Sequence, residues 1–359
     1  MAQSTDGYTK DEIFKAFRTV AINSMIMCVA AFGLINFLYN TTWYLTAYHY
    51  ISRPILKYNY VDFLREKGEL VSATDKTFVL PPTSSSKDDE YNNLSISLID
   101  GAVGSNEERK IIAYDGETHT AIVDKRFDKI PPKGAAYQIN NTGWYPRAVK
   151  NIYMSGPLLC AGLALLFFGL FYSASRKSIN YRMFMLWAFI WSVNYLLAEW
   201  MAVSFLRYSG IGVLTRYWYW TERDRFIAAL VALVVITFYG RFITNFFMQF
   251  TPSMKYMKRG NYKVLALYAI LFPAIVTSLA IMAFRMSYDW PITFALAAGG
   301  MIMALVTYSR AGERNFKVTF FEETYNPGIS VGGLVFLGII VAIHLYLAVF
   351  HYSMEAGYF

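Results

Sequence analysis

The chain has 359 residues, of which 55% are hydrophobic, 18% are aromatic and only 16% are charged. Soluble domains carry about 25% charged residues, so this composition excludes a pair of ordinary soluble enzyme domains and an intrinsically disordered chain. Two cysteines also exclude a disulfide-stapled secreted scaffold. The formal net charge of +8 would suit nucleic-acid binding, so the positions of the charges decide that question.

Seven apolar stretches approach the roughly 20 residues needed to cross about 30 Å of hydrocarbon. They lie at 20–47, 153–175, 183–206, 226–250, 264–284, 291–309 and 330–352. Core helices of soluble proteins rarely run so far without a polar face. We therefore predict an all-α polytopic membrane protein with about seven transmembrane helices.

The chain begins with a predicted cytoplasmic amphipathic segment, residues 1–19, in which Ile13, Phe14 and Phe17 share an apolar face. The first transmembrane helix follows at 20–47. Its apolar stretch is too long for a cleavable signal peptide.

Residues 53–150 differ in composition, and we expect a small β-rich extracytoplasmic domain there. Runs with strand character occur at 76–80, 94–99, 110–114 and 118–123. Asp115-Gly116 between the last two runs predicts a two-residue type I′ hairpin turn. Residues 58–67 are compatible with a short helix that extends the first span.

A six-helix transmembrane bundle is predicted over 153–352, with an extracytoplasmic tail at 353–359. If the connections alternate between the two sides, thirteen Lys and Arg residues fall on one side and five on the other. The excess marks the cytoplasmic side. The positive charge therefore reports orientation and contact with anionic lipid, and nucleic acid is not an expected partner.

Few polar groups lie within the predicted spans. Glu199, His344 and Asn36 reach a similar depth at 1.5 Å per residue, and Asn194 lies on a face partly shared with Glu199. One hypothesis is a proton-handling or polar ligand site at Glu199 and His344. The alternatives are inter-helix hydrogen bonds that fix packing, or exposure of Glu199 to outer water or to a partner subunit.

The connection 207–225 is rich in aromatic residues. One interpretation is a membrane-interface belt in which Thr221 caps the following helix. The other is a docking surface for another protein, since Tyr, Trp and Arg dominate binding hot spots. The possible partner-contact residues are Arg216, Tyr217, Trp218, Tyr219 and Trp220.

Motifs for nucleotide, metal or nucleophilic chemistry are absent from the sequence: there is no HExxH, CxxC, GxxxxGK[ST] or GxSxG. We expect no metal and no cofactor.

Ser155-Gly156-Pro157-Leu158 follow the β-rich segment at the start of the second span. This layout resembles that of bacterial intramembrane metalloproteases of the site-2 type. Their HExxH motif and their later Asp-containing ligand motif are missing, so the resemblance implies a relative without zinc chemistry and no functional residue is transferred.

The sequence thus predicts a non-enzymatic integral membrane subunit of a larger membrane or cell-envelope assembly. Its expected location is the bacterial inner membrane, with lipid and other membrane or envelope proteins as partners. The alternatives are a proton-coupled or small-solute transporter that uses Glu199, and a catalytically degenerate site-2-type protease relative.

Overall fold

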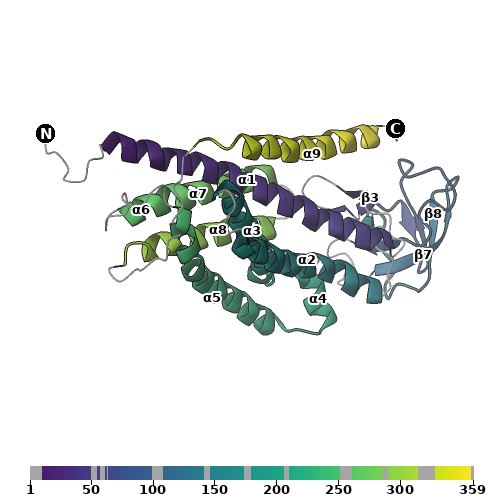
Figure 1. The fold of residues 1–359 in the computed structure, drawn as a ribbon. Coiled ribbons are helices and arrows are strands. Elements are labelled where there is room, and N and C mark those ends of the chain that lie inside the picture. Colours follow the sequence, from purple (N-terminus) through teal and green to yellow (C-terminus); the bar gives the residue numbers. More distant parts are fainter. Residues whose placement is uncertain are drawn as a thin grey trace. The chain divides into compact units, whose positions relative to one another are not determined.

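A computed structural model describes residues 10–49, 55–56, 61–62, 64–98, 108–140, 146–173, 179–205, 210–250, 261–285, 290–313 and 328–356. The chain divides into two compact units, one formed by 1–39 with 156–359 and the other by 40–155. The first unit is helical. The second contains the β-strands that lie in the chain between helix α1 (Lys10–His49) and helix α2 (Pro146–Ser173) (Figure 1).

Most of the described chain is helical. Helix α1 runs without interruption from the expected amphipathic segment through the first apolar stretch. The other helices after α2 are α3 (Ile179–Ala202), α4 (Ile211–Tyr217), α5 (Glu222–Phe247), α6 (Asn261–Ala266), α7 (Phe272–Arg285), α8 (Trp290–Arg310) and α9 (Val331–Ala356). Thus α9 extends beyond 352, where we expected the last span to end.

Six helical segments of the described chain are long and apolar enough to cross a membrane. They are Phe17–Ala47, Lys150–Ser173, Glu222–Phe250, Tyr262–Ala283, Trp290–Arg310 and Val331–Ala348. Helix α3 is not among the six because its Trp, Tyr, Asn and Glu residues lower its mean hydropathy. It is nevertheless the right length, since 24 residues extend about 36 Å at 1.5 Å per residue.

Helices α6 and α7 are joined by a π-helical turn, η3 (Leu267–Leu271), shortly before Pro273. Proline has no N–H, so the carbonyl of Ala269, four residues earlier, lacks its α-helical donor. The Ser24 hydroxyl of α1 donates to that carbonyl (2.5 Å) and accepts from the indole N–H of Trp187 in α3 (2.9 Å). Three helices therefore meet at one buried hydroxyl.

Helices α1 and α9 run parallel, side by side within the helical unit (Figure 1). Contacts occur in the same order along both helices: Asn23 with the Ser330 amide (2.9 Å), Gly33 with Ile340, and Asn36 with His344 (3.2 Å). A Cβ at Gly33 would lie 2.5 Å from the Ile340 Cγ2 atom, so glycine is needed for this approach. Helix α3 runs in the same direction, since Trp187 meets Ser24 and Tyr195 meets Asn36.

Helices α2 and α5 run parallel to each other and antiparallel to α3. Aromatic rings define the pairing, with Phe168 on Phe242 (6.0 Å between centroids) and Phe171 on Phe250 (6.4 Å). Helix α3 meets α5 in reverse order, because Trp187 packs on Phe247 and Trp200 on Trp220. The direction of α5 is therefore opposite to that of α3 and the same as that of α2.

The β-unit contains a seven-stranded antiparallel sheet with strand order β3-β9-β6-β7-β8-β5-β4. The strands are β3 (Leu64–Glu69), β4 (Ser72–Ala73), β5 (Thr77–Val79), β6 (Ser95–Leu98), β7 (Glu108–Asp115), β8 (Thr120–Val123) and β9 (Ala136–Asn140); β1 (Ile55–Leu56) pairs separately with β2 (Val61–Asp62). Its core includes Phe78, Ile96, Ile111, Val123 and Tyr137. The four strands expected from the sequence correspond to β5, β6, β7 and β8.

Two local expectations in this unit are wrong. Residues 61–62 and 64–69 form strands, so 58–67 is not a helix. The β7–β8 hairpin has a four-residue loop, 116–119, because Asp115 pairs with Thr120. The Asp115 carboxylate accepts from the Glu117 and Thr118 amides (2.9 and 3.3 Å), and His119 is left-handed at φ 51°. Those bonds stabilise a longer loop than the dipeptide alone predicts.

We predict that Ser24→Ala lowers the free energy of unfolding by about 2 kcal/mol, because it leaves both the Ala269 carbonyl and the Trp187 indole N–H without this partner. Pro273→Ala restores an amide that can bond the Ala269 carbonyl. In that background Ser24→Ala should cost about 1 kcal/mol less. A double-mutant cycle measured by denaturant unfolding in mixed micelles checks this prediction. Additive effects of the two substitutions would contradict the claim that both act on the Ala269 carbonyl.

Candidate functional site

A polar cluster joins α1, α3 and α9. The His344 Nδ1 atom lies 2.8 Å from the Ile340 carbonyl and donates to it, which leaves Nε2 to accept from the Asn36 amide (3.2 Å). The Asn36 Oδ1 atom in turn accepts from the Tyr195 hydroxyl (2.7 Å). The similar depth counted from the sequence therefore correctly indicated that Asn36 and His344 could meet. Tyr195 had no distinguishing signal in a chain with 28 tyrosines.

Glu199 and Asn194 bind elsewhere. The buried Glu199 carboxylate accepts from the Ile211 amide at the start of α4 (3.1 Å). Gly210, the residue before Ile211, has a left-handed backbone at φ 54°. Asn194 donates to the Leu296 carbonyl of α8 (2.9 Å). The similar depth predicted for Glu199 did not bring it to His344, because depth does not specify the helix face.

The aromatic connection forms the turn between α4 and α5. The side chains of Arg216 and Tyr217 lie outside the described part of the structure. Tyr219 is 92% exposed and has a left-handed backbone at φ 59°, whereas Trp218 and Trp220 are partly buried with ring centroids 6.0 Å apart. Thr221 caps α5 as the sequence predicts, through a reciprocal capping box with Asp224.

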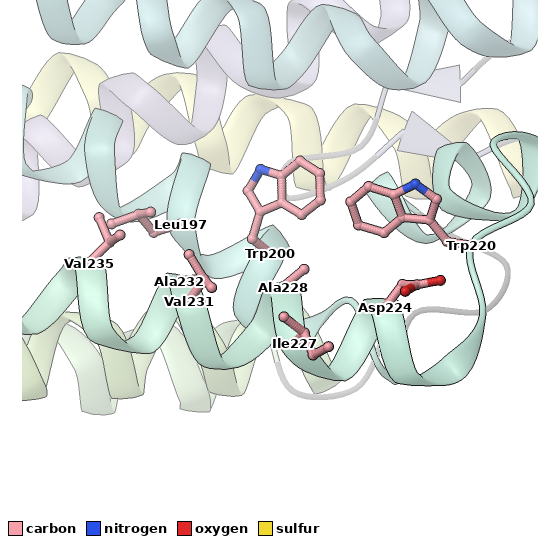
Figure 2. A pocket seen from close by; sticks show the side chains of 9 residues that line it. All are labelled: Leu197, Trp200, Trp220, Asp224, Ile227, Ala228, Val231, Ala232 and Val235. Carbon is pink, nitrogen blue, oxygen red and sulfur yellow. The ribbon is translucent and has the colours of Figure 1, made fainter.

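A cavity of about 560 Å³ opens between α3 and α5. Its aliphatic lining consists of Leu197, Ile227, Ala228, Val231, Ala232 and Val235. Figure 2 shows Trp220 next to Asp224 at one end, the indole of Trp200 between Trp220 and the aliphatic residues, and Leu197 and Val235 at the other end. Sequence analysis did not predict this cavity, because it depends on which faces of α3 and α5 meet. Of the predicted partner-contact residues whose side chains the structure describes, Trp220 lines the cavity.

A separate polar cluster lies in the β-unit around Glu66 of β3. Its carboxylate accepts from the hydroxyls of Ser84 (2.5 Å), Tyr91 and Tyr137. The Tyr114 hydroxyl donates to the Ser85 carbonyl (2.5 Å), and its ring meets that of Tyr91 at 4.5 Å. These bonds tie the loop 81–93 to the sheet. No group of three or more metal-ligating side chains occurs among the described residues.

Burial holds the tyrosines of this cluster in their neutral form. It raises the pKa of Tyr114 to about 12, and the negative charges of Glu66, Asp115 and Asp88 add to the shift. Burial also raises the pKa of Tyr91 and of Tyr137, and so does the hydrogen bond that each gives to Glu66, which only the neutral phenol can make.

The described chain is thus a multi-pass helical membrane protein with six candidate membrane spans and a separate antiparallel sheet. Comparison with protein-family models, with curated proteins and with solved structures finds no match to it. Its function is therefore inferred from the contacts within the chain.

We predict that the β-unit loses stability as the pH rises above about 10. An unfolded tyrosine ionises near that pH, whereas folded Tyr114 keeps its proton until about 12. The folded state then binds more protons than the unfolded state, and the stability gained from the neutral phenol falls through this window. Tyr114→Phe should reduce the slope of melting temperature against pH, measured on the full chain from about pH 8 to about pH 12.

Tyr172→Phe, which changes an exposed tyrosine of α2, is the control and should leave the slope unchanged. Equal slopes for wild type and Tyr114→Phe would contradict the prediction.

Proposed function

We propose that the protein is a non-enzymatic integral membrane subunit of a larger membrane or cell-envelope assembly in the bacterial inner membrane. Its role in this proposal is to anchor and contact partner proteins. Residues 53–150 would form the extracytoplasmic domain and the N-terminus would be cytoplasmic.

The exposed tyrosine of the α4–α5 turn is the observation that carries the proposal. A left-handed backbone at a non-glycine residue costs about 1 kcal/mol or more, yet Tyr219 adopts φ 59° and leaves its ring 92% exposed. The left-handed backbone ends α4, because it lets the Trp220 amide donate to the Thr215 carbonyl (2.9 Å) as in a helix C-cap. The ring itself gains no burial within the described chain. Burial of this ring by a partner would account for a large exposed tyrosine at the turn, because tyrosine is a frequent hot-spot residue.

The polar groups inside the helical unit support a structural role. Asn194 bonds the Leu296 carbonyl, Asn36 bonds Tyr195 and His344, and Ser278 bonds the Ala297 carbonyl (3.1 Å). Each contact joins two helices, as inter-helix hydrogen bonds in membranes do. None of them requires a substrate to complete it.

Seven spans are proposed in place of six because of the helix directions. Helix α2 and helix α5 run parallel, as the pairs Phe168–Phe242 and Phe171–Phe250 define. Two parallel spans need a crossing between them, and α3 runs antiparallel to both with 24 residues. The parallel contact of α1 with α9 also requires an odd total number of crossings.

Transport through Glu199 is the alternative function, with weaker support. Its carboxylate bonds the Ile211 amide and so fixes the start of α4. Kinship with site-2-type proteases is the other alternative, and it rests on the position of Ser155-Gly156-Pro157-Leu158 after the β-rich segment.

We predict that the α4–α5 turn faces the outside and that the end of α8 faces the cytoplasm. In a Cys28→Ala/Cys160→Ala background, Tyr219→Cys should react with a membrane-impermeant maleimide on intact spheroplasts. Glu313→Cys, also at an exposed position, should react only after permeabilisation. If α3 did not cross the membrane, the pattern would be reversed: Glu313→Cys would react on intact spheroplasts and Tyr219→Cys only after permeabilisation. The seven-span proposal would then fail.

We predict that Tyr219→Gly weakens the assembly without harming the folded chain. Glycine relieves the left-handed backbone, so the melting temperature of the isolated chain should stay constant or rise. Loss of the ring should weaken association by about 2 kcal/mol, the usual size of a hot-spot effect. Particle mass after mild-detergent extraction measures this.

Tyr219→Phe keeps the ring and is the matched control. A wild-type particle that contains a single chain would contradict the assembly proposal. If the assembly stays intact with Tyr219→Gly, the α4–α5 turn is not a docking surface, and the interpretation as a membrane-interface belt remains.

A further inference from the structure

The cavity between α3 and α5 extends along α5. Its lining on this helix runs from Asp224 to Val235, which is about 16 Å at 1.5 Å per residue. One leaflet of a hydrocarbon core about 30 Å thick has a similar depth. The cavity therefore matches the length of one leaflet.

The α5 wall of the cavity is continuous with an exposed apolar surface. Ile227 and Val231 of the lining are 47% and 56% exposed, and the neighbouring Leu230, Val234 and Phe238 are exposed as well. Glu222–Phe250 is one of the candidate membrane spans. The cavity thus opens sideways along a helix whose apolar side chains face hydrocarbon.

The end of the cavity beside the aromatic turn has a different chemistry. The rings of Trp200 and Trp220 lie 5.8 Å apart, and Asp224 is the single charged residue among the described residues that line the cavity. Its carboxylate accepts from the Thr221 amide and hydroxyl (2.9 and 2.8 Å), which leaves further lone pairs for another donor. A carboxylate beside two indole rings is complementary to a cation.

We propose that this cavity is a specific binding site for one phospholipid with a primary ammonium headgroup, phosphatidylethanolamine. One acyl chain lies along the aliphatic lining from Ile227 to Val235. The ammonium group donates to the Asp224 carboxylate and contacts the indole of Trp220, which packs on Trp200. A quaternary ammonium lacks N–H donors for the carboxylate, and an anionic headgroup is repelled by it, so both bind more weakly.

Native mass spectrometry of the delipidated full chain, titrated with phosphatidylethanolamine, phosphatidylcholine or phosphatidylglycerol of identical acyl chains, tests the proposal. We expect one tightly retained phosphatidylethanolamine, preferred over phosphatidylglycerol by about fivefold or more, the scale of one exposed charged contact. Asp224→Asn should remove that preference. Glu222→Gln, which makes the same charge change outside the lining, should retain it.

Substitutions that fill the cavity test the proposed position of the acyl chain. Ala228→Phe fills it from α5, and Val231→Trp does so from an exposed position that tolerates a larger side chain. Both should abolish the retained lipid, whereas Val234→Phe, on the exposed surface outside the lining, should not. Melting temperatures establish that each variant is folded.

Three results would overturn the proposal. The first is equal retention of the lipid by the filled variants. The second is equal binding of phosphatidylethanolamine and phosphatidylglycerol by the wild type. The third is a polypeptide segment, in place of lipid, cross-linked to a photoreactive group at Val231 in native membranes.

Discussion

The helical unit depends on one constraint, which is that every buried backbone carbonyl needs a donor where water is absent. Pro273 breaks that rule for the Ala269 carbonyl, and Ser24 of α1 restores it while also accepting from Trp187 of α3. The same helix holds α9 through Asn23, which exchanges hydrogen bonds with the Gly328 carbonyl and the Ser330 amide. Helix α1 is thus the element to which α3, α7 and α9 are all bonded. Its polar residues stabilise the arrangement of the bundle more directly than its apolar ones, which lipid could solvate equally well.

Some residues bond other helices, whereas others only suit lipid. This distinction also decides which helices could be predicted from the sequence. Hydropathy measures how well a segment suits lipid, so it finds α5 and α9, whose apolar residues are largely exposed. It underrates α3, whose Trp187, Trp191 and Asn194 are buried against other helices. The apolar stretch 183–206 nevertheless predicted a span there, because its length suits a crossing of the bilayer. In the β-unit, β5 to β8 were predictable from alternating apolar residues, whereas β3 was not, because its sequence LREKGE is almost wholly polar.

The candidate sites show a similar limit. Counting residues along each helix gave comparable depths for Asn36, His344 and Glu199, and the structure brings the first two together. Glu199 bonds α4, a short helix that hydropathy does not detect. The cavity between α3 and α5 was beyond prediction for another reason. Ala228 and Ala232 are ordinary helix residues, and only the separation of the two helices turns these small side chains into the lining of a cavity.

The aromatic content, 18% of the chain, also has a structural explanation. Rings of Phe168, Phe171, Phe242 and Phe246 interlock α2 with α5, mostly edge to face, with centroids 5.1 to 6.0 Å apart. Lipid is as apolar as an aliphatic side chain, so burial alone gives helices little reason to associate in a membrane. Aromatic pairs add directional attraction beyond the area they bury, and so they can hold helices together where the hydrophobic effect cannot. Tyr219 lies outside these packed pairs and is 92% exposed, and our proposal assigns its ring to a partner, whereas the paired rings are accounted for by packing within the described chain.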